Sequence, residues 1–81
     1  KEMSESHLYL LDDNEHTFQY VYAALMKVLR HMPTQAEQCC LIAHNVGKAH
    51  IKVGDIMEVQ KLKKELAEYE IKTEISNTKY V

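Results

Sequence analysis

The sequence predicts an α/β (α+β) fold, a two-layer sandwich in which three helices pack on one face of a three-stranded sheet. Short apolar or alternating runs of strand length occur at 7–11, 48–53 and 71–75. Between them, apolar residues recur at the three- and four-residue spacing of amphipathic helices. The 81 residues, of which 46% are hydrophobic and 27% charged, suit one small domain with a single core. The expected order of elements is therefore β-α-α-β-α-β.

The first strand is expected at 7–11, because the chain is apolar after His7 and suits burial on both faces. A helix follows at about 18–29, with His16 or Thr17 as the residue that caps its N-terminus. Helical spacing predicts one buried stripe on this helix, made of Tyr20, Val21, Ala24, Leu25, Val28 and Leu29.

The next helix begins after Pro33, which ends the first one. Residues 34–37 (TQAE) fit a capping box, in which the first and fourth side chains satisfy backbone N–H groups at the helix start. We expect this helix to end at about 45–46, with Gly47 as its C-terminal stop.

The second half of the chain adds a strand at 48–53, a helix and a last strand at 71–75. Asp55 is expected to cap this helix, since Glu58 stands three residues later. The inward side of the helix is expected to consist of Ile56, Val59, Leu62 and Leu66.

Domain boundaries and composition narrow the classes of function. We expect 1–6 to be a flexible remnant of a slightly longer protein, 7–76 to be the folded domain and 77–81 to be a tail. A net charge of −2 gives no electrostatic footprint for nucleic acid, and no apolar run approaches the ~20 residues that span a bilayer. Cys39 and Cys40 are neighbours, a spacing that strains a disulfide, so we expect reduced thiols in a cytosol-like compartment.

Three residues with side-chain oxygens, Asp12, Asp13 and Asn14, stand together between the first strand and the first helix. Such residues usually serve the backbone there, as turn formers or caps. The functional alternative is an ammonium site, because a carboxylate and an amide oxygen can each accept a charge-assisted hydrogen bond worth ~1.5–3 kcal/mol. The local sequence leaves both interpretations open.

A second candidate pair, Cys40 and His44, is spaced i and i+4 and therefore shares one face of the second helix. Such a pair is typical of zinc sites and thiol nucleophiles, but zinc needs further protein ligands and a nucleophile needs an orienting partner. The sequence indicates neither, so we expect no metal, no cofactor and no catalytic residue. His44 suits either a helix C-terminal cap or a neutral nitrogen directed at the same site as Asp12 and Asn14.

Three motifs together resemble the ClpS family, the adaptors that bring N-degron substrates to a Clp AAA+ protease. The acceptor cluster stands in LDDNEHTFQYV (11–21), the first helix carries LMKV (25–28), and the second helix ends in AHNVGKA (43–49). The resemblance covers roughly residues 8–76, and the fold of the family agrees with the order of elements derived above.

The resemblance implies a non-enzymatic adaptor. Such a protein binds the free α-amino group and the bulky apolar first side chain of a substrate, and hands it to the N-terminal domain of a Clp AAA+ unfoldase. It also implies a monomer in the bacterial cytoplasm, with no nucleic-acid or membrane partner. Carried over position by position, the α-amino group would be held by Asp12, Asn14 and His44, and the side-chain pocket would consist of Phe18, Val21, Cys40, Ala43 and Ile71.

Three pocket positions depart from the usual residues of the family. Phe18 and Cys40 each stand where Met is typical, and Ala43 stands where Val is typical. The two smaller residues deepen one wall, and Phe18 adds a flat face for stacking. We therefore expect Phe, Tyr or Trp to be preferred over Leu as the first residue, with Ile and Val poor because they branch at Cβ. If Phe18 instead closes the slot, small first residues bind best.

Two other classes of function are alternatives. One is a structural interaction domain similar to the C-terminal domain of the ribosomal stalk protein, in which Asp12, Asn14 and His44 are only caps. The other is a small thiol or metal enzyme built on Cys40 and His44. Only an adaptor of the ClpS type predicts that a peptide with a free N-terminus binds far better than its N-acetylated twin.

Overall fold

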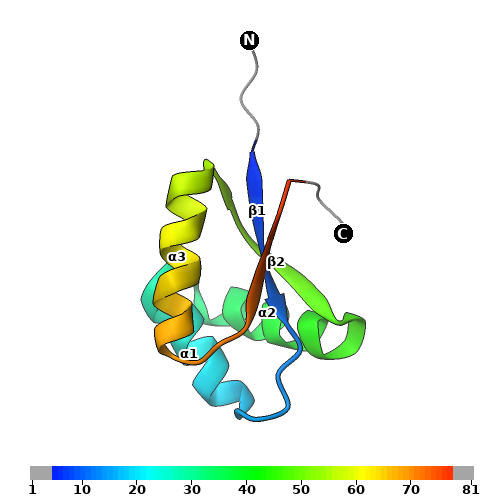
Figure 1. The fold of residues 1–81 in the computed structure, drawn as a ribbon. Helices are drawn as coiled ribbons and strands as arrows, with labels where there is room; N and C mark the ends of the chain where they lie inside the picture. The colour runs from blue at the N-terminus through cyan, green and yellow to red at the C-terminus, as the bar shows by residue number, and fades with distance from the viewer. Residues whose placement is uncertain (1–4, 78–81) are drawn as a thin grey trace.

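The computed structural model describes residues 5–77, and the expectations for 1–4 and 78–81 lie outside this range. Three helices and a three-stranded antiparallel sheet follow one another in the order β-α-α-β-α-β, which confirms the predicted fold class (Figure 1). The elements are β1 (Ser6–Leu11), α1 (Phe18–Leu29), α2 (Pro33–Val46), β2 (Lys48–Gly54), α3 (Ile56–Glu68) and β3 (Thr73–Ser76).

The central strand of the sheet is β1, which pairs antiparallel with both β2 and β3. Leu8, Tyr9 and Leu10 are each at most 1% exposed, so the strand is buried on both faces as predicted. Leu8 and Leu10 belong to the core that the helices cover. Tyr9 packs instead against its cross-strand neighbour His50, and the Lys48 ammonium lies over its ring.

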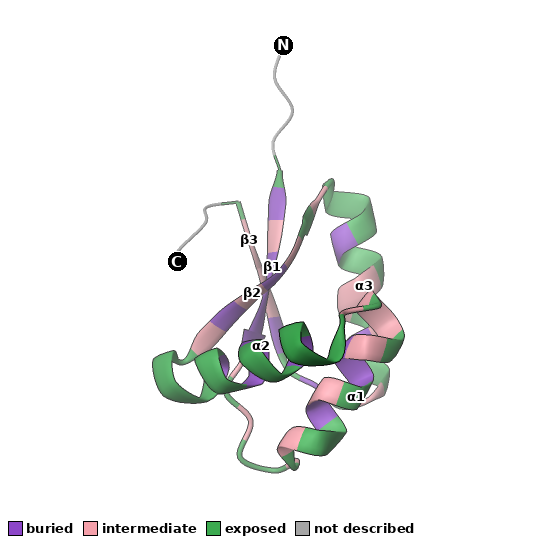
Figure 2. Cartoon of the chain, turned by 180° about the vertical axis from the view of Figure 1, so that it is seen from behind, coloured by how far each residue is buried: buried purple, intermediate pink, exposed green. Residues whose placement is uncertain are grey.

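The core lies between the sheet and the helices. In Figure 2 the buried residues follow the strands and the inner sides of the helices, whereas the outer sides of the helices are exposed. The buried core residues are Leu8, Leu10, Val21, Ala24, Leu25, Ala36, Cys39, Cys40, Ala43, Ala49, Ile51, Val59, Leu66 and Ile71. Within the described range, no helix is both long enough and apolar enough to cross a membrane.

The first two strands each extend one residue further than predicted. β1 begins at Ser6 rather than His7, and β2 ends at Gly54 rather than Val53. The reason is that Ser6 and Gly54 pair with each other across the two strands. Because Ser6 is only 2% exposed, it belongs to the sheet, and its assignment to a flexible remnant was wrong.

The last strand begins at Thr73, two residues later than the predicted 71–75. The end of α3 uses the intervening backbone, since the N–H groups of Glu70 and Ile71 donate to carbonyls of the last helical turn. Glu70 also adopts a left-handed φ of 62°, which turns the chain away from the helix before pairing starts.

The start of α1 decides between the two predicted caps. Thr17 is the cap, because its hydroxyl accepts a hydrogen bond from the N–H of Tyr20 at 3.1 Å. Tyr20 itself is 42% exposed and does not belong to the buried stripe, since its hydroxyl donates to the carbonyl of Tyr69. The remaining residues predicted for the stripe, Val21, Ala24, Leu25, Val28 and Leu29, are buried or partly buried.

The capping box predicted at 34–37 does not form. α2 begins at Pro33, and Met32 is an N-cap without a side-chain hydrogen bond. Proline is favoured at the first helical position because the N–H it lacks has no helical partner there. Gly47 ends the helix as predicted, with a φ of 109° and its N–H donating to the carbonyl of Ala43 at 2.9 Å.

Helix α3 begins as predicted, with Asp55 accepting a hydrogen bond from the backbone N–H three residues later at 2.9 Å. Of the residues expected on its inner side, Val59 and Leu66 are fully buried and Leu62 is half-buried. Ile56 is 42% exposed at the first helical position, contrary to the expectation.

Candidate functional site

A pocket lies between the loop 12–17, the start of α1 and the last turns of α2. Six of the eight residues predicted for the site line it, and Asn14 and Ile71 do not. The lining residues are Leu10, Leu11, Asp12, Asp13, His16, Phe18, Val21, Cys40, Ala43 and His44.

Helical spacing places the apolar walls of the pocket. Phe18 and Val21 stand three residues apart on α1, while Cys40, Ala43 and His44 share one face of α2. Val21, Cys40 and Ala43 are at most 5% exposed, and the Phe18 side chain is partly buried against them. Val21, Cys40 and Ala43 are therefore fixed in the core, whereas Phe18 is a large wall residue that is only partly buried.

The rim of the pocket is formed by Asp12 and His44. Oδ1 of Asp12 lies 3.5 Å from Nδ1 of His44, and the side chains are 38% and 55% exposed. The backbone N–H of Asp12 donates to the carbonyl of Gly47 at 3.2 Å, which fixes the end of β1 beside the end of α2. A pair this long and this exposed contributes little to stability, so the Asp12 oxygens can accept hydrogen bonds from a ligand.

The pocket is narrow in this structure. Its cavity volume is about 20 Å³, which is room for about one water molecule. The ring of Phe18 meets the ring of His44 edge-on, with centroids 5.6 Å apart and an interplanar angle of 74°. Phe18 therefore lies between the apolar wall and the polar rim.

Asp13 lines the pocket beside Asp12, but its carboxylate is already occupied. Oδ1 accepts the backbone N–H groups of Glu15 at 2.7 Å and His16 at 3.2 Å, and Oδ2 accepts from Nδ1 of His16 at 2.5 Å. Burial by itself raises the pKa of Asp13, but these hydrogen bonds from the His16 ring and the backbone together hold the pKa below its ordinary value. The carboxylate is therefore ionised and serves the loop.

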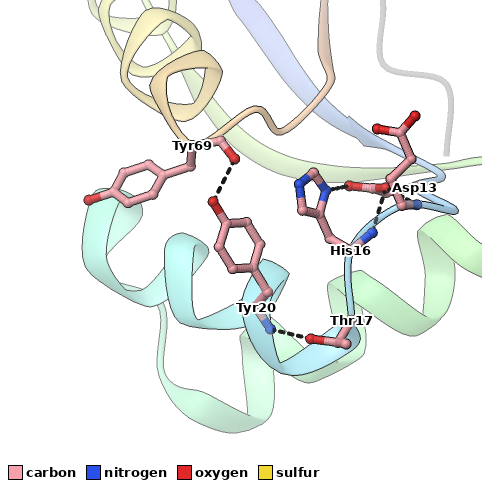
Figure 3. A network of polar contacts seen from close by, with 6 residues as sticks. Asp13, His16, Thr17, Tyr20 and Tyr69 are labelled. Carbon is pink, nitrogen blue, oxygen red and sulfur yellow. Dashed lines mark hydrogen bonds and ion pairs between the residues drawn. The ribbon is translucent and has the colours of Figure 1, made fainter.

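Four lining residues were not predicted for the pocket, and His16 is one of them, together with Leu10, Leu11 and Asp13. Its ring stacks on Tyr20, with centroids 4.7 Å apart and an interplanar angle of 12°. Figure 3 shows two sets of polar contacts beside the loop, one between His16 and Asp13 and the other from Tyr20 to Thr17 and Tyr69. The available signal was Asp followed three residues later by His, a spacing typical of side chains that close a turn.

The turn at Asp13 explains why Asn14 is outside the pocket. The Asp13 carboxylate folds back over the N–H groups of the second and third residues after it, and the intervening Asn14 side chain is exposed. Of the three residues in the acceptor cluster, Asp12 and Asp13 therefore line the pocket and Asn14 does not.

Ile71 is buried elsewhere. It is 3% exposed in the core and lines a separate groove together with Leu11, Lys63 and Thr73. The hydrogen bond from its N–H to the carbonyl of Leu66 holds it in the turn that ends α3, away from the pocket between α1 and α2.

The two cysteines are free thiols in the core. Burial raises the pKa of Cys39, and burial together with the nearby Cys39 and Glu37 raises the pKa of Cys40 to about 11. Cys40 is therefore protonated at neutral pH, and a protonated thiol is a poor nucleophile and metal ligand. Within residues 5–77, no three His, Cys, Asp or Glu side chains are grouped to hold a metal ion.

The arrangement combines acceptor atoms at a rim with an apolar slot behind them. Asp12 supplies a carboxylate that is not committed to backbone donors, and His44 supplies a ring nitrogen beside it. Such a rim suits a cationic donor, and the slot behind it suits an apolar group attached to that donor. The chemistry indicated is binding of an amine that carries an apolar substituent.

Comparisons with known proteins agree with this architecture. The sequence model of the family described as ATP-dependent Clp protease adaptor protein ClpS matches residues 1–76. Among curated protein sequences, none matches the chain significantly. The solved structure of Agrobacterium tumefaciens ClpS2 bound to L-phenylalaninamide has the same fold, with a TM-score of 0.83 and 18% sequence identity over 93% of this chain and 98% of that chain. Since the family model spans nearly the whole sequence, the chain belongs to the ClpS family of protease adaptors.

Proposed function

We propose that this protein binds the free α-amino group and the bulky apolar first side chain of N-degron substrates and hands them to a Clp AAA+ unfoldase. The observation that carries the proposal is the meeting of Asp12 and His44, from two different elements, at the rim of an apolar pocket. Further support comes from the ligand of the A. tumefaciens relative, L-phenylalaninamide, which joins an α-amino group to an aromatic side chain.

Each rim residue has a distinct role in the proposal. The Asp12 carboxylate accepts hydrogen bonds from the α-ammonium group and supplies the opposite charge. His44 with a proton on Nδ1 faces Asp12, which leaves its other ring nitrogen able to accept a hydrogen bond. Asn14 is omitted because its side chain is exposed outside the pocket.

The first side chain of the substrate occupies the slot between α1 and α2. Because the cavity volume is only about 20 Å³, a Leu or Phe side chain requires the ring of Phe18 to turn away from His44. Phe18 can do so at lower cost than the other walls, since Val21, Cys40 and Ala43 are fixed in the core. The displaced ring then offers a face against which an aromatic side chain stacks.

The expected affinity is micromolar. Two charge-assisted hydrogen bonds contribute ~1.5–3 kcal/mol each, and burial of a large apolar side chain contributes a further ~1.5–3 kcal/mol. Loss of rotational and translational freedom, together with the movement of Phe18, offsets a large part of this gain.

A titration with two peptides tests the proposal. One peptide begins with Phe and has a free N-terminus, and its twin is N-acetylated. We expect micromolar binding of the first and at least tenfold weaker binding of the second, because acetylation removes the charge and two donors. Equal binding of both peptides contradicts the proposal and favours the structural interaction domain.

Delivery and compartment belong to the same proposal. Membership of an adaptor family supports an AAA+ unfoldase of the Clp type as the partner, through its N-terminal domain. Two reduced thiols in the core support a reducing compartment, which we infer to be the bacterial cytoplasm. Degradation of a reporter with an N-terminal Phe by a reconstituted Clp protease, with and without this protein, tests the delivery step.

A further inference from the structure

We propose that His16 is a positioning residue for the α-amino site, acting through Asp13 to fix the loop that carries Asp12. This inference rests on the proposed function and identifies how the binding rim is held in place. It assigns a role to a side chain that touches neither of the two rim residues by any hydrogen bond in the structure.

The first step of the argument is the state of Asp13. All three of its hydrogen bonds come from within the loop, and the side chain is only 8% exposed. A carboxylate with this many donors is a weak further acceptor for a ligand. Although Asp13 lines the pocket, its part is therefore to close the turn that follows Asp12.

The second step is that His16 is itself anchored. Its ring is 16% exposed, stacks on Tyr20 of α1, and donates from Nδ1 to Asp13. The hydroxyl of Tyr20 in turn donates to the carbonyl of Tyr69 at 2.8 Å, just beyond α3. His16 therefore packs the loop against α1, and Tyr20 links that part of α1 to the residue that follows α3.

The third step is that His16 is not needed as a helix cap. Thr17 already caps α1, and its hydroxyl accepts the N–H of Tyr20 at 3.1 Å. His16 also lines the pocket, together with Asp13. Because these contacts already order the loop, binding of a ligand does not have to offset the entropy lost on ordering it. A site preorganised in this way binds its ligand more tightly.

The test compares two variants of His16, which separate the effect of the ring from that of its Nδ1 donor, with one control variant. His16→Phe keeps a stackable ring and removes the Nδ1 donor, while His16→Asn restores a donor at a similar distance from Cα. Gln19→Ala, an exposed position on the same helix start, is the matched control. Affinity is measured for the free-amino Phe peptide and for its N-acetylated twin, and folding is followed by thermal unfolding.

We expect His16→Phe to bind the free-amino peptide roughly tenfold more weakly while its weak binding of the acetylated twin is unchanged. His16→Asn should recover affinity to within about threefold of the parent, and Gln19→Ala should stay within about twofold. If His16 only stabilises the fold, His16→Phe lowers the unfolding temperature but keeps the parent's preference for the free-amino peptide. That result overturns the inference.

Two further outcomes keep the inference separate from the proposed function. If the parent protein prefers the free amine and a folded His16→Phe does so equally well, the function stands and the inference is wrong. If the parent shows no preference, both are wrong. Should His16→Phe not fold, Tyr20→Leu decides, because it removes the ring on which His16 stacks. An unchanged affinity in Tyr20→Leu then overturns the inference, and a loss of about threefold supports it.

Discussion

Two carboxylate–imidazole pairs stand on the same pocket and differ in almost every physical respect. In the first, Asp13 and His16 are 2.5 Å apart with side chains 8% and 16% exposed, and the carboxylate accepts three donors. In the second, Asp12 and His44 are 3.5 Å apart with side chains 38% and 55% exposed. The two carboxylates are adjacent in sequence, yet one is saturated and the other is available.

The difference teaches that residue type does not decide which acid binds a ligand. Asp13 is followed by the N–H groups that its own carboxylate can reach, so it closes a local turn. Asp12 is held through its backbone by the carbonyl of Gly47, which leaves the side chain at the rim. The saturated pair gives the loop its shape, and the open pair can exchange a weak mutual contact for a stronger one with a ligand.

The largest expected effect comes from removing the open carboxylate. Asp12→Ala should weaken binding of a free-amino Phe peptide by ~1.5–3 kcal/mol, because a charged acceptor facing an ammonium is lost. The free energy of unfolding should change by less than about 1 kcal/mol, since the side chain is 38% exposed and makes only a long ion pair. Calorimetric titration and denaturant unfolding measure the two quantities.

The matched control for Asp12→Ala is Glu15→Ala. Glu15 is an exposed acid on the same loop whose side chain does not line the pocket. Equal losses in the two variants would show that Asp12 acts only through long-range charge, against the contact proposed for it.

Removal of the saturated carboxylate, that of Asp13, should have the opposite balance, with a larger loss of stability and a smaller loss of binding than Asp12→Ala. Asp13→Ala leaves two backbone N–H groups and the His16 ring without their acceptor, which should lower the free energy of unfolding by roughly 1–2 kcal/mol. Binding should weaken only as far as the loop is disordered. If Asp12→Ala destabilises the fold more than Asp13→Ala does, the contrast between the two pairs is wrong.

Acidification should also distinguish the saturated pair. Because the pKa of Asp13 is lower in the folded state than in the unfolded state, its contribution to stability is fully present above its ordinary value near 3.8. That contribution is lost as the pH falls through the lowered pKa. The unfolding temperature of the parent should therefore drop more steeply below about pH 4 than that of Asp13→Asn, which has no such proton to take up. Parallel curves would contradict this.

The smallest expected effect concerns the first side chain of the substrate. If Phe18 turns and stacks on the ligand, Phe, Tyr and Trp should bind better than Leu by ~0.5–1.5 kcal/mol, with Ile and Val weaker still. A panel of peptides differing only in residue one measures this. Tighter binding of Ala or Ser than of Phe would show instead that Phe18 keeps the slot closed, as the cavity of about 20 Å³ permits.

The order of elements could be predicted from the sequence because it depends on short-range periodicity, whereas most of the pocket was implied by the resemblance to the ClpS family. Apolar spacing placed α1 at Phe18–Leu29 without error, and the caps at Asp55 and Gly47 follow from local backbone chemistry. Cys40 and His44 share a helix face by spacing alone, which is why they reach the same pocket.

Other features depend on contacts between distant segments, and no local pattern contains them. Tyr20 fits a buried stripe by spacing, but a carbonyl beyond α3 holds its hydroxyl near the surface. Ile71 fits an alternating strand, but the turn that ends α3 withdraws it from the pocket. The same holds for the size of the slot, which is set by how closely α1 packs on α2 and by where the ring of Phe18 comes to rest. Local backbone propensities act over about four residues, whereas the position of a side chain relative to another element is fixed only when the core closes.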